Sequence, residues 1–140
     1  MKLSIDTGVK KIEIIRNGEH VGDVEFSLSD PALLSRLRDV AKKAEAIQAE
    51  SKLSELDDID AQLDEAKRID KEMRDLLDWA FGASVSDIVF GNSFCFTTSG
   101  GVTAIEQFLT GVMPFIEEAF RSEVDAAKER QDKYLSKYRK

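Results

Sequence analysis

The sequence predicts an α+β fold that is mostly helical, in which an N-terminal antiparallel β-hairpin precedes about four α-helices. Two β-branched, roughly alternating segments flank Asn17-Gly18 near the N-terminus. After Pro31, apolar residues recur every three or four positions, as in amphipathic helices. The length of 140 residues suits one core. We therefore expect a single domain over residues 1–140.

The hairpin is predicted by segments 12–16 and 21–26, because Asn and Gly accept the positive φ angles of a tight turn. Segment 3–6 is a candidate third strand, since a two-stranded ribbon is only marginally stable in water. We assign residues 1–28 to this β-ribbon. Its apolar face needs a helix to cover it.

Residues 30–81 are predicted to form a helical hairpin. Ser29 and Asp30 precede Pro31 and are suited to begin the first helix. Ser54, with Asp57 three residues later, predicts the start of the second. The second helix has the strongest periodicity in the chain, and an ordinary bundle helix is favoured over a coiled coil because only about three heptads are sustained. Its apolar seam consists of Leu56, Ile59, Leu63, Ala66, Ile69, Met73, Leu76 and Ala80.

Residues 82–140 hold the aromatic-rich segment and the C-terminal helices. Seven of the eight phenylalanines lie between Phe81 and Phe120. Gly82 is expected to end the second helix, and Ser84 with Asp87 to cap a short helix that ends near Gly91. The stretch 93–101 is predicted to be an extended or loop segment.

The last helical region is predicted to begin at a capping box formed by Thr103 and Glu106. Pro114 is expected to kink or restart the helix. Beyond Lys128 the apolar residues are few, which predicts an end that projects from the core or docks on a partner. The basic residues of segment 133–140 are interpreted as a solvated end that compensates the helix dipole.

Composition and charge exclude several functional classes. The formal net charge is −7, which argues against general nucleic-acid binding because phosphates require a basic face. No long apolar stretch resembles a signal peptide or a membrane span. The single cysteine excludes an internal disulfide. We expect a soluble cytoplasmic protein that contacts neither nucleic acid nor membrane.

Few residues suit catalysis or metal binding. His20 follows the hairpin turn, where a histidine is usually just exposed, and Cys95 lies between two phenylalanines, where its thiolate is disfavoured. The acidic residues near Asp57 fan around a helix and lack the EF-hand spacing, so they predict a solvated face. Gly100-Gly101 matches no phosphate-loop pattern and is interpreted as a turn. We expect no enzyme activity, no cofactor and no metal.

Protein binding remains as the favoured class of function. The second helix and the aromatic segment carry the apolar residues available for contact, and Phe94 and Phe96 share one face if their segment is extended. We also consider a homo-oligomer, because the narrow seam suits pairing with another subunit. The predicted partner-binding residues are Leu63, Ile69, Met73, Phe94, Phe96 and Phe115.

The C-terminal half resembles small tail proteins encoded by siphophages and prophages of Gram-positive bacteria. The resemblance is carried by the repeated Phe-Gly of Phe81-Gly82 and Phe90-Gly91 within segment 78–91, a later helix with Phe108, Pro114 and Phe115, and the charged tail 134–140. In that family a β-hairpin precedes charged helices, as expected here. Segment 93–101 departs from the charged linker of the family.

The resemblance implies a tail assembly chaperone, which holds the long tape-measure protein soluble until the tail tube polymerises around it. Such a protein acts in the cytoplasm of the bacterial host. The alternatives are a structural tail or virion-associated component, and another small oligomeric helical interaction protein. An enzyme that uses the acidic residues is the least favoured hypothesis.

Overall fold

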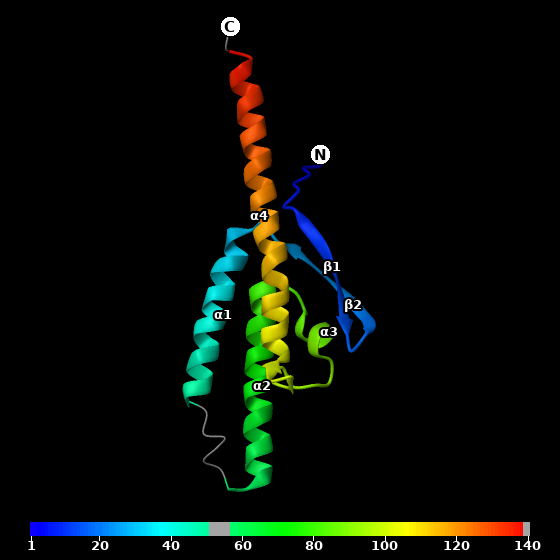
Figure 1. The fold of residues 1–140 in the computed structure, drawn as a ribbon, viewed down its shortest axis with the longest axis vertical. Helices are drawn as coiled ribbons and strands as arrows, with labels where there is room; N and C mark the ends of the chain where they lie inside the picture. The colour runs from blue at the N-terminus through cyan, green and yellow to red at the C-terminus, as the bar shows by residue number, and fades with distance from the viewer. Residues whose placement is uncertain (51–56, 139–140) are drawn as a thin grey trace.

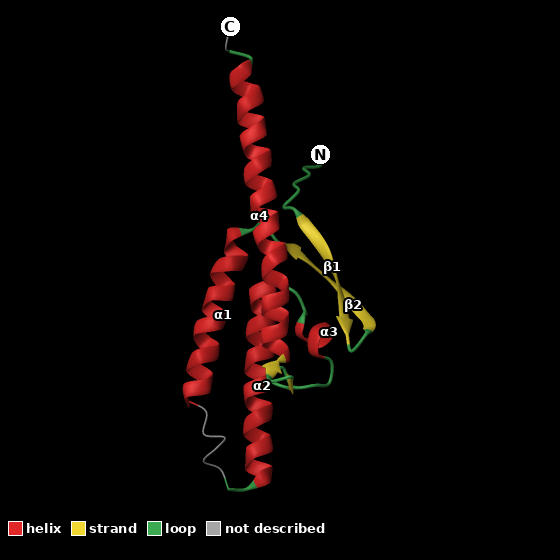
Figure 2. Ribbon diagram, viewed as in Figure 1, coloured by secondary structure: helices red, strands yellow, loops and turns green. Residues whose placement is uncertain are grey.

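The computed structural model describes residues 1–50 and 57–138, without the side chains of residues 48–50. Within these residues it confirms the α+β class, with an N-terminal antiparallel hairpin followed by four helices (Figures 1 and 2). The elements are β1 (Val9–Arg16), β2 (Glu19–Ser27), α1 (Pro31–Glu50), α2 (Ile59–Phe81), α3 (Ser86–Phe90), β3 (Thr98–Ser99), β4 (Val102–Thr103) and α4 (Ala104–Ser136).

Strands β1 and β2 form the predicted hairpin, with Ile12 opposite Val24. Asn17 and Gly18 both have positive φ angles, 53° and 82°, which confirms the turn signal. Val24 and Phe26 are buried in the core, whereas Ile15 on the other side of β1 is exposed. The hairpin thus has one apolar face toward the helices.

The candidate third strand at residues 3–6 is wrong, because this segment is not part of a sheet. Gly8 donates its backbone N–H to Asp6 Oδ1 at 2.8 Å, and Gly8 has a φ of 75°. This side-chain turn changes the chain direction just before β1. An extended strand therefore cannot run through residues 6–8.

Helices α1 and α2 lie side by side and run in opposite directions, as the predicted hairpin requires (Figure 1). Asp30 Oδ1 accepts the N–H of Ala32 at 2.9 Å, which confirms the start of α1. The α2 helix begins at Ile59 and is capped by Asp58, not by the predicted pair of Ser54 and Asp57. Ser54 and Leu56 lie outside the described residues.

Helix α3 is capped from a distance. One oxygen of Asp78 accepts the backbone N–H groups of Val85 and Ser86 at 2.9 and 2.8 Å, and the other accepts the Ser86 hydroxyl at 2.9 Å. The predicted capping pair of Ser84 and Asp87 is therefore wrong, since the first turn is already satisfied by a carboxylate from α2.

Helix α4 runs without interruption through Pro114, so the predicted restart at that residue is wrong. The Thr103 Oγ accepts the N–H of Glu106 at 3.2 Å, which confirms the predicted start. Pro114 removes a hydrogen bond to the carbonyl of Thr110, but Thr110 is exposed, so water can bond that carbonyl. Val112 and Ile116 on either side of Pro114 are buried and hold the helix in place.

Three phenylalanine rings connect the hairpin, α2 and α4. The ring centroids of Phe26 and Phe81 are 4.6 Å apart, and those of Phe81 and Phe108 are 5.4 Å apart. Phe81 is 5% exposed at the end of α2. Tilted rings at these distances attract each other beyond the effect of burial alone. Phe81 therefore connects the hairpin, α2 and α4 in the core.

The repeated Phe-Gly has a structural explanation. Phe81 and Phe90 are buried at the last residues of α2 and α3, and Gly82 and Gly91 follow them with φ angles of 67° and 58°. Each dipeptide thus buries a ring and ends a helix with a glycine at positive φ, which is left-handed at Gly82. The C-cap predicted for Gly82 is confirmed.

Candidate protein-binding groove

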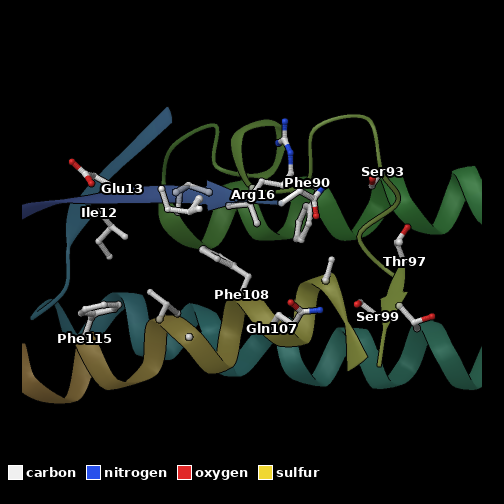
Figure 3. A pocket seen from close by; sticks show the side chains of 18 residues that line it. Ile12, Glu13, Arg16, Phe90, Ser93, Thr97, Ser99, Gln107, Phe108 and Phe115 are labelled. Atoms are coloured by element: carbon white, nitrogen blue, oxygen red, sulfur yellow. The ribbon is translucent and has the colours of Figure 1, made fainter. Parts of the chain in front are cut away.

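A groove of about 510 Å³ lies between the hairpin and α3 on one side and α4 on the other. Figure 3 shows Phe108 projecting from α4 toward β1, with Phe115 across from Ile12. Because β1 and α4 supply the two walls, the groove follows the first part of α4, from Ala104 to Phe115. It is partly open to solvent.

The two ends of the groove differ in chemistry. Ile12 and Phe115 lie at one end, and the side chain of Phe115 is 52% exposed. Ser93, Thr97 and Ser99 lie at the opposite end (Figure 3). An amphipathic segment with an apolar stripe and a polar terminus would match this arrangement.

Arg16 and Gly91 fix the wall formed by α3. The Arg16 Nη1 donates to the carbonyl of Ile88 at 2.7 Å and so ties β1 to α3. A Cβ at Gly91 would lie 2.6 Å from the Arg16 guanidinium carbon. Gly91 is therefore favoured by its positive φ, and a side chain there would also displace the Arg16 guanidinium.

Asp70 and Arg74 of α2 hold the segment that ends the groove. The Arg74 guanidinium bonds Asp70 Oδ2 at 3.0 Å and also donates to the carbonyls of Gly91 and Ser93. Asp70 Oδ1 accepts the N–H of Cys95 at 2.7 Å. The loop between α3 and β3 is thus fixed by charge-assisted hydrogen bonds.

The predicted partner-binding residues do not lie on one surface. Phe115 lines the groove and Leu63 is exposed on α2, whereas Ile69 and Met73 are 8% and 0% exposed in the core. The buried pair packs inside the molecule, so neither side chain is available to a partner in this structure. Their helical spacing predicts an apolar face but does not say what covers it.

Phe94 and Phe96 are half-buried and are not in an extended strand. The N–H of Thr97 bonds the carbonyl of Phe94 at 2.9 Å, so residues 94–97 form a turn around the buried Cys95. The part of the segment that is extended is limited to β3 and β4, joined at Gly100-Gly101. Around these rings the segment is therefore a loop, and the extended conformation in which they would share one face is not formed.

The sequence did not single out Ile12 and Phe108 as parts of a binding surface. Ile12 is one of several β-branched residues in a strand, and Phe108 is one of several aromatic residues in a helix. Their role in the groove depends on the approach of β1 to α4, which joins residues about 100 positions apart in the chain. A local pattern cannot predict such a pairing.

His20 and the acidic residues near the start of α2 lie at the surface. The exposed His20 contacts Asp23 at 2.9 Å, and this hydrogen bond raises the pKa of the imidazole. Within residues 1–50 and 57–138, no group of three or more His, Cys, Asp or Glu side chains is placed to hold a metal ion. Asp57, Asp58, Asp60 and Asp64 are exposed, as expected for a solvated face, and Glu55 lies outside the described residues.

We expect the Cys95 thiol to be inert in the folded protein. Burial raises its pKa to about 12, and the neighbouring Asp70 carboxylate acts in the same direction. A rise from 9.0 to about 12 lowers the thiolate fraction near neutral pH roughly a thousandfold. Reaction of this thiol with a disulfide reagent should be slow in buffer. It should be fast in urea on the order of 8 M, which unfolds small proteins and so removes the burial that raises the pKa. Comparable rates in both solvents would contradict the buried placement.

Comparison of the sequence with protein-family models and with curated proteins, and of the fold with solved structures, gave no match. In the part of the chain that the structure describes, no helix combines the length and the apolar character needed to cross a membrane.

Proposed function

We propose that the protein is a non-enzymatic tail assembly chaperone, which binds an apolar helical segment of a phage tape-measure protein in the groove between β1 and α4. The observation that carries the proposal is the open groove, walled by Ile12 and Phe108 and flanked by the exposed Phe115. A groove with apolar walls accepts an amphipathic helix through side chains spaced by three, four and seven residues. The protein would act in the bacterial host cytoplasm.

The charged body of the protein supports the same role. A chaperone must stay soluble while its apolar surface is occupied, and the chain carries a formal net charge of −7. The resemblance of segment 78–91 to small phage tail proteins supplies the identity of the client. The groove supplies the place at which the client would bind.

Co-expression with the tape-measure protein of the same phage or prophage tests the proposal. The wild-type protein should keep the client in the soluble fraction. Phe115→Glu should weaken the complex roughly tenfold or more, because a charge replaces a large apolar contact. Ala41→Glu, on the exposed side of α1, is the matched control and should have no effect.

Leu63→Glu tests whether the client binds in the groove or on the exposed face of α2. Leu63 is 49% exposed and does not line the groove. We expect this variant to behave like wild type. Loss of client solubility with Leu63→Glu but not with Phe115→Glu would transfer the binding surface to α2. An insoluble client in the presence of the wild-type protein would contradict the proposed function.

A further inference from the structure

The distal half of α4 projects from the body as a free arm (Figure 1). All residues from Arg121 to Tyr138 are exposed. Val124 is 51% exposed, Tyr134 is 61% exposed and Tyr138 is 73% exposed. Apart from the contact between the Tyr134 and Tyr138 rings, these side chains pack against nothing, whereas helices of this length draw most of their stability from packing of an apolar face.

The exposed residues continue the buried face of α4. At about 100° per residue, positions that follow Val112 and Ile116 by three or four residues fall on the same side of the helix. This stripe is buried against the body as far as Ile116 and half-buried at Phe120. Beyond the body it forms a seam with alternating spacings of four and three, namely Phe120, Val124, Ala127, Gln131, Tyr134 and Tyr138.

We propose that this seam pairs with the same seam of a second copy of the chain, in an antiparallel two-helix coiled coil. In antiparallel register Phe120 faces Tyr138 of the other copy, Val124 faces Tyr134, and Ala127 faces Gln131. Each contact occurs twice about a twofold axis, as an isologous dimer requires. The small Ala127 leaves a hollow beside Tyr134, into which a partner side chain can pack.

Charge favours the antiparallel direction. The part of the arm nearest the body carries Glu117, Glu118, Glu123 and Asp125 against a single base, Arg121. The distal part carries Lys128, Arg130, Lys133 and Lys137 against two acids, Glu129 and Asp132. Antiparallel pairing brings the acidic end of each arm to the basic end of the other and places Glu123 beside Lys137 twice, against the two like-charge approaches of Lys128 and Arg130 to their own copies at the twofold axis. Parallel pairing would place like ends together.

The position of the body also favours the antiparallel direction. The stripe of α4 that continues into the seam is covered by the rest of the molecule at Ile105, Val112 and Ile116. A parallel partner would bring its own body to this same level on the same face, so the two bodies would overlap. An antiparallel partner brings only the tip of its arm to that level and carries its body at the far end.

The mass of the full-length protein in solution tests the pairing. Wild type should have a mass approaching twice that of one chain by light scattering at concentrations near 100 μM, where a dimer with a dissociation constant on the order of 10 μM is mostly formed. Val124→Lys combined with Tyr134→Lys should give the mass of one chain. Ser122→Lys, on the opposite side of the arm, should remain a dimer. A monomeric wild type, or a dimer unaffected by the double change, would overturn the proposal.

Cysteine cross-linking tests the direction. Val124→Cys and Tyr134→Cys proteins should form a disulfide-linked dimer when mixed, and neither should cross-link alone. In the antiparallel pair, two copies of position 124 lie about 15 Å apart along the axis, which no disulfide can span. Cross-linking of each variant with itself would overturn the antiparallel arrangement. These results do not depend on the tape-measure protein, so the dimer and the proposed function can fail separately.

Discussion

Replacement of Phe81 by alanine is expected to lower the free energy of unfolding by about 4 kcal/mol, the typical cost of emptying a large aromatic site in a core. Phe81 is 5% exposed, and its ring contacts Phe26 of the hairpin and Phe108 of α4. The change therefore removes the contact that joins three elements. Chemical denaturation followed by circular dichroism measures the loss.

Phe115→Ala is the matched control for Phe81→Ala. Both residues are phenylalanines of the aromatic segment, but the side chain of Phe115 is 52% exposed. We expect a change within about 0.5 kcal/mol, as for most surface substitutions. Similar losses for the two variants would contradict the central position of Phe81. If Phe81→Ala does not fold, Phe81→Leu should show a smaller loss in the same direction.

Arg74→Ala is expected to cost about 3 kcal/mol, since it removes one partner of a mostly buried ion pair and leaves the charge of Asp70 stabilised only by the N–H of Cys95. The side chains of Arg74 and Asp70 are 15% and 13% exposed. Arg74 also donates to the carbonyls of Gly91 and Ser93. Its loss should loosen the loop between α3 and β3 and raise the rate of hydrogen exchange at the Cys95 amide.

Arg68→Ala provides a control on the same helix. Arg68 pairs with Glu65 and Glu72, but its side chain is 54% exposed, so solvent screens the pair and the effect should be much smaller than that of Arg74→Ala. Arg74→Lys should fall between the two, because it keeps the charge but not the planar fork that bonds several acceptors. Equal effects of Arg74→Ala and Arg68→Ala would show that the loop is not held by Arg74.

The sequence predicts those parts of the fold that depend on neighbouring residues. Asn17-Gly18 makes the hairpin turn, Asp30-Pro31 begins α1, Gly82 ends α2 and Thr103 caps α4. In each case the residue satisfies a local backbone requirement, either a positive φ or an unpaired N–H group. These signals are contained within three or four residues.

The remaining features depend on distant partners. Asp78 caps α3 from the preceding helix, and Asp70 bonds Cys95 across 25 positions. Because either carboxylate could equally face solvent on an isolated helix, no local pattern distinguishes it from its neighbours. The continuity of α4 through Pro114 likewise depends on the packing of Val112 and Ile116. The groove is predicted only in part for the same reason, with Phe115 as its one expected residue.

The most direct test of the proposed binding groove is a tagged pull-down from the native host during prophage induction, with partners identified by mass spectrometry. Wild type, Phe115→Glu and Ala41→Glu should be compared in parallel. We predict that a long helical tail protein is the dominant partner of wild type and Ala41→Glu, and that it is depleted from Phe115→Glu. Absence of such a protein, or its equal recovery with Phe115→Glu, would contradict client binding in the groove.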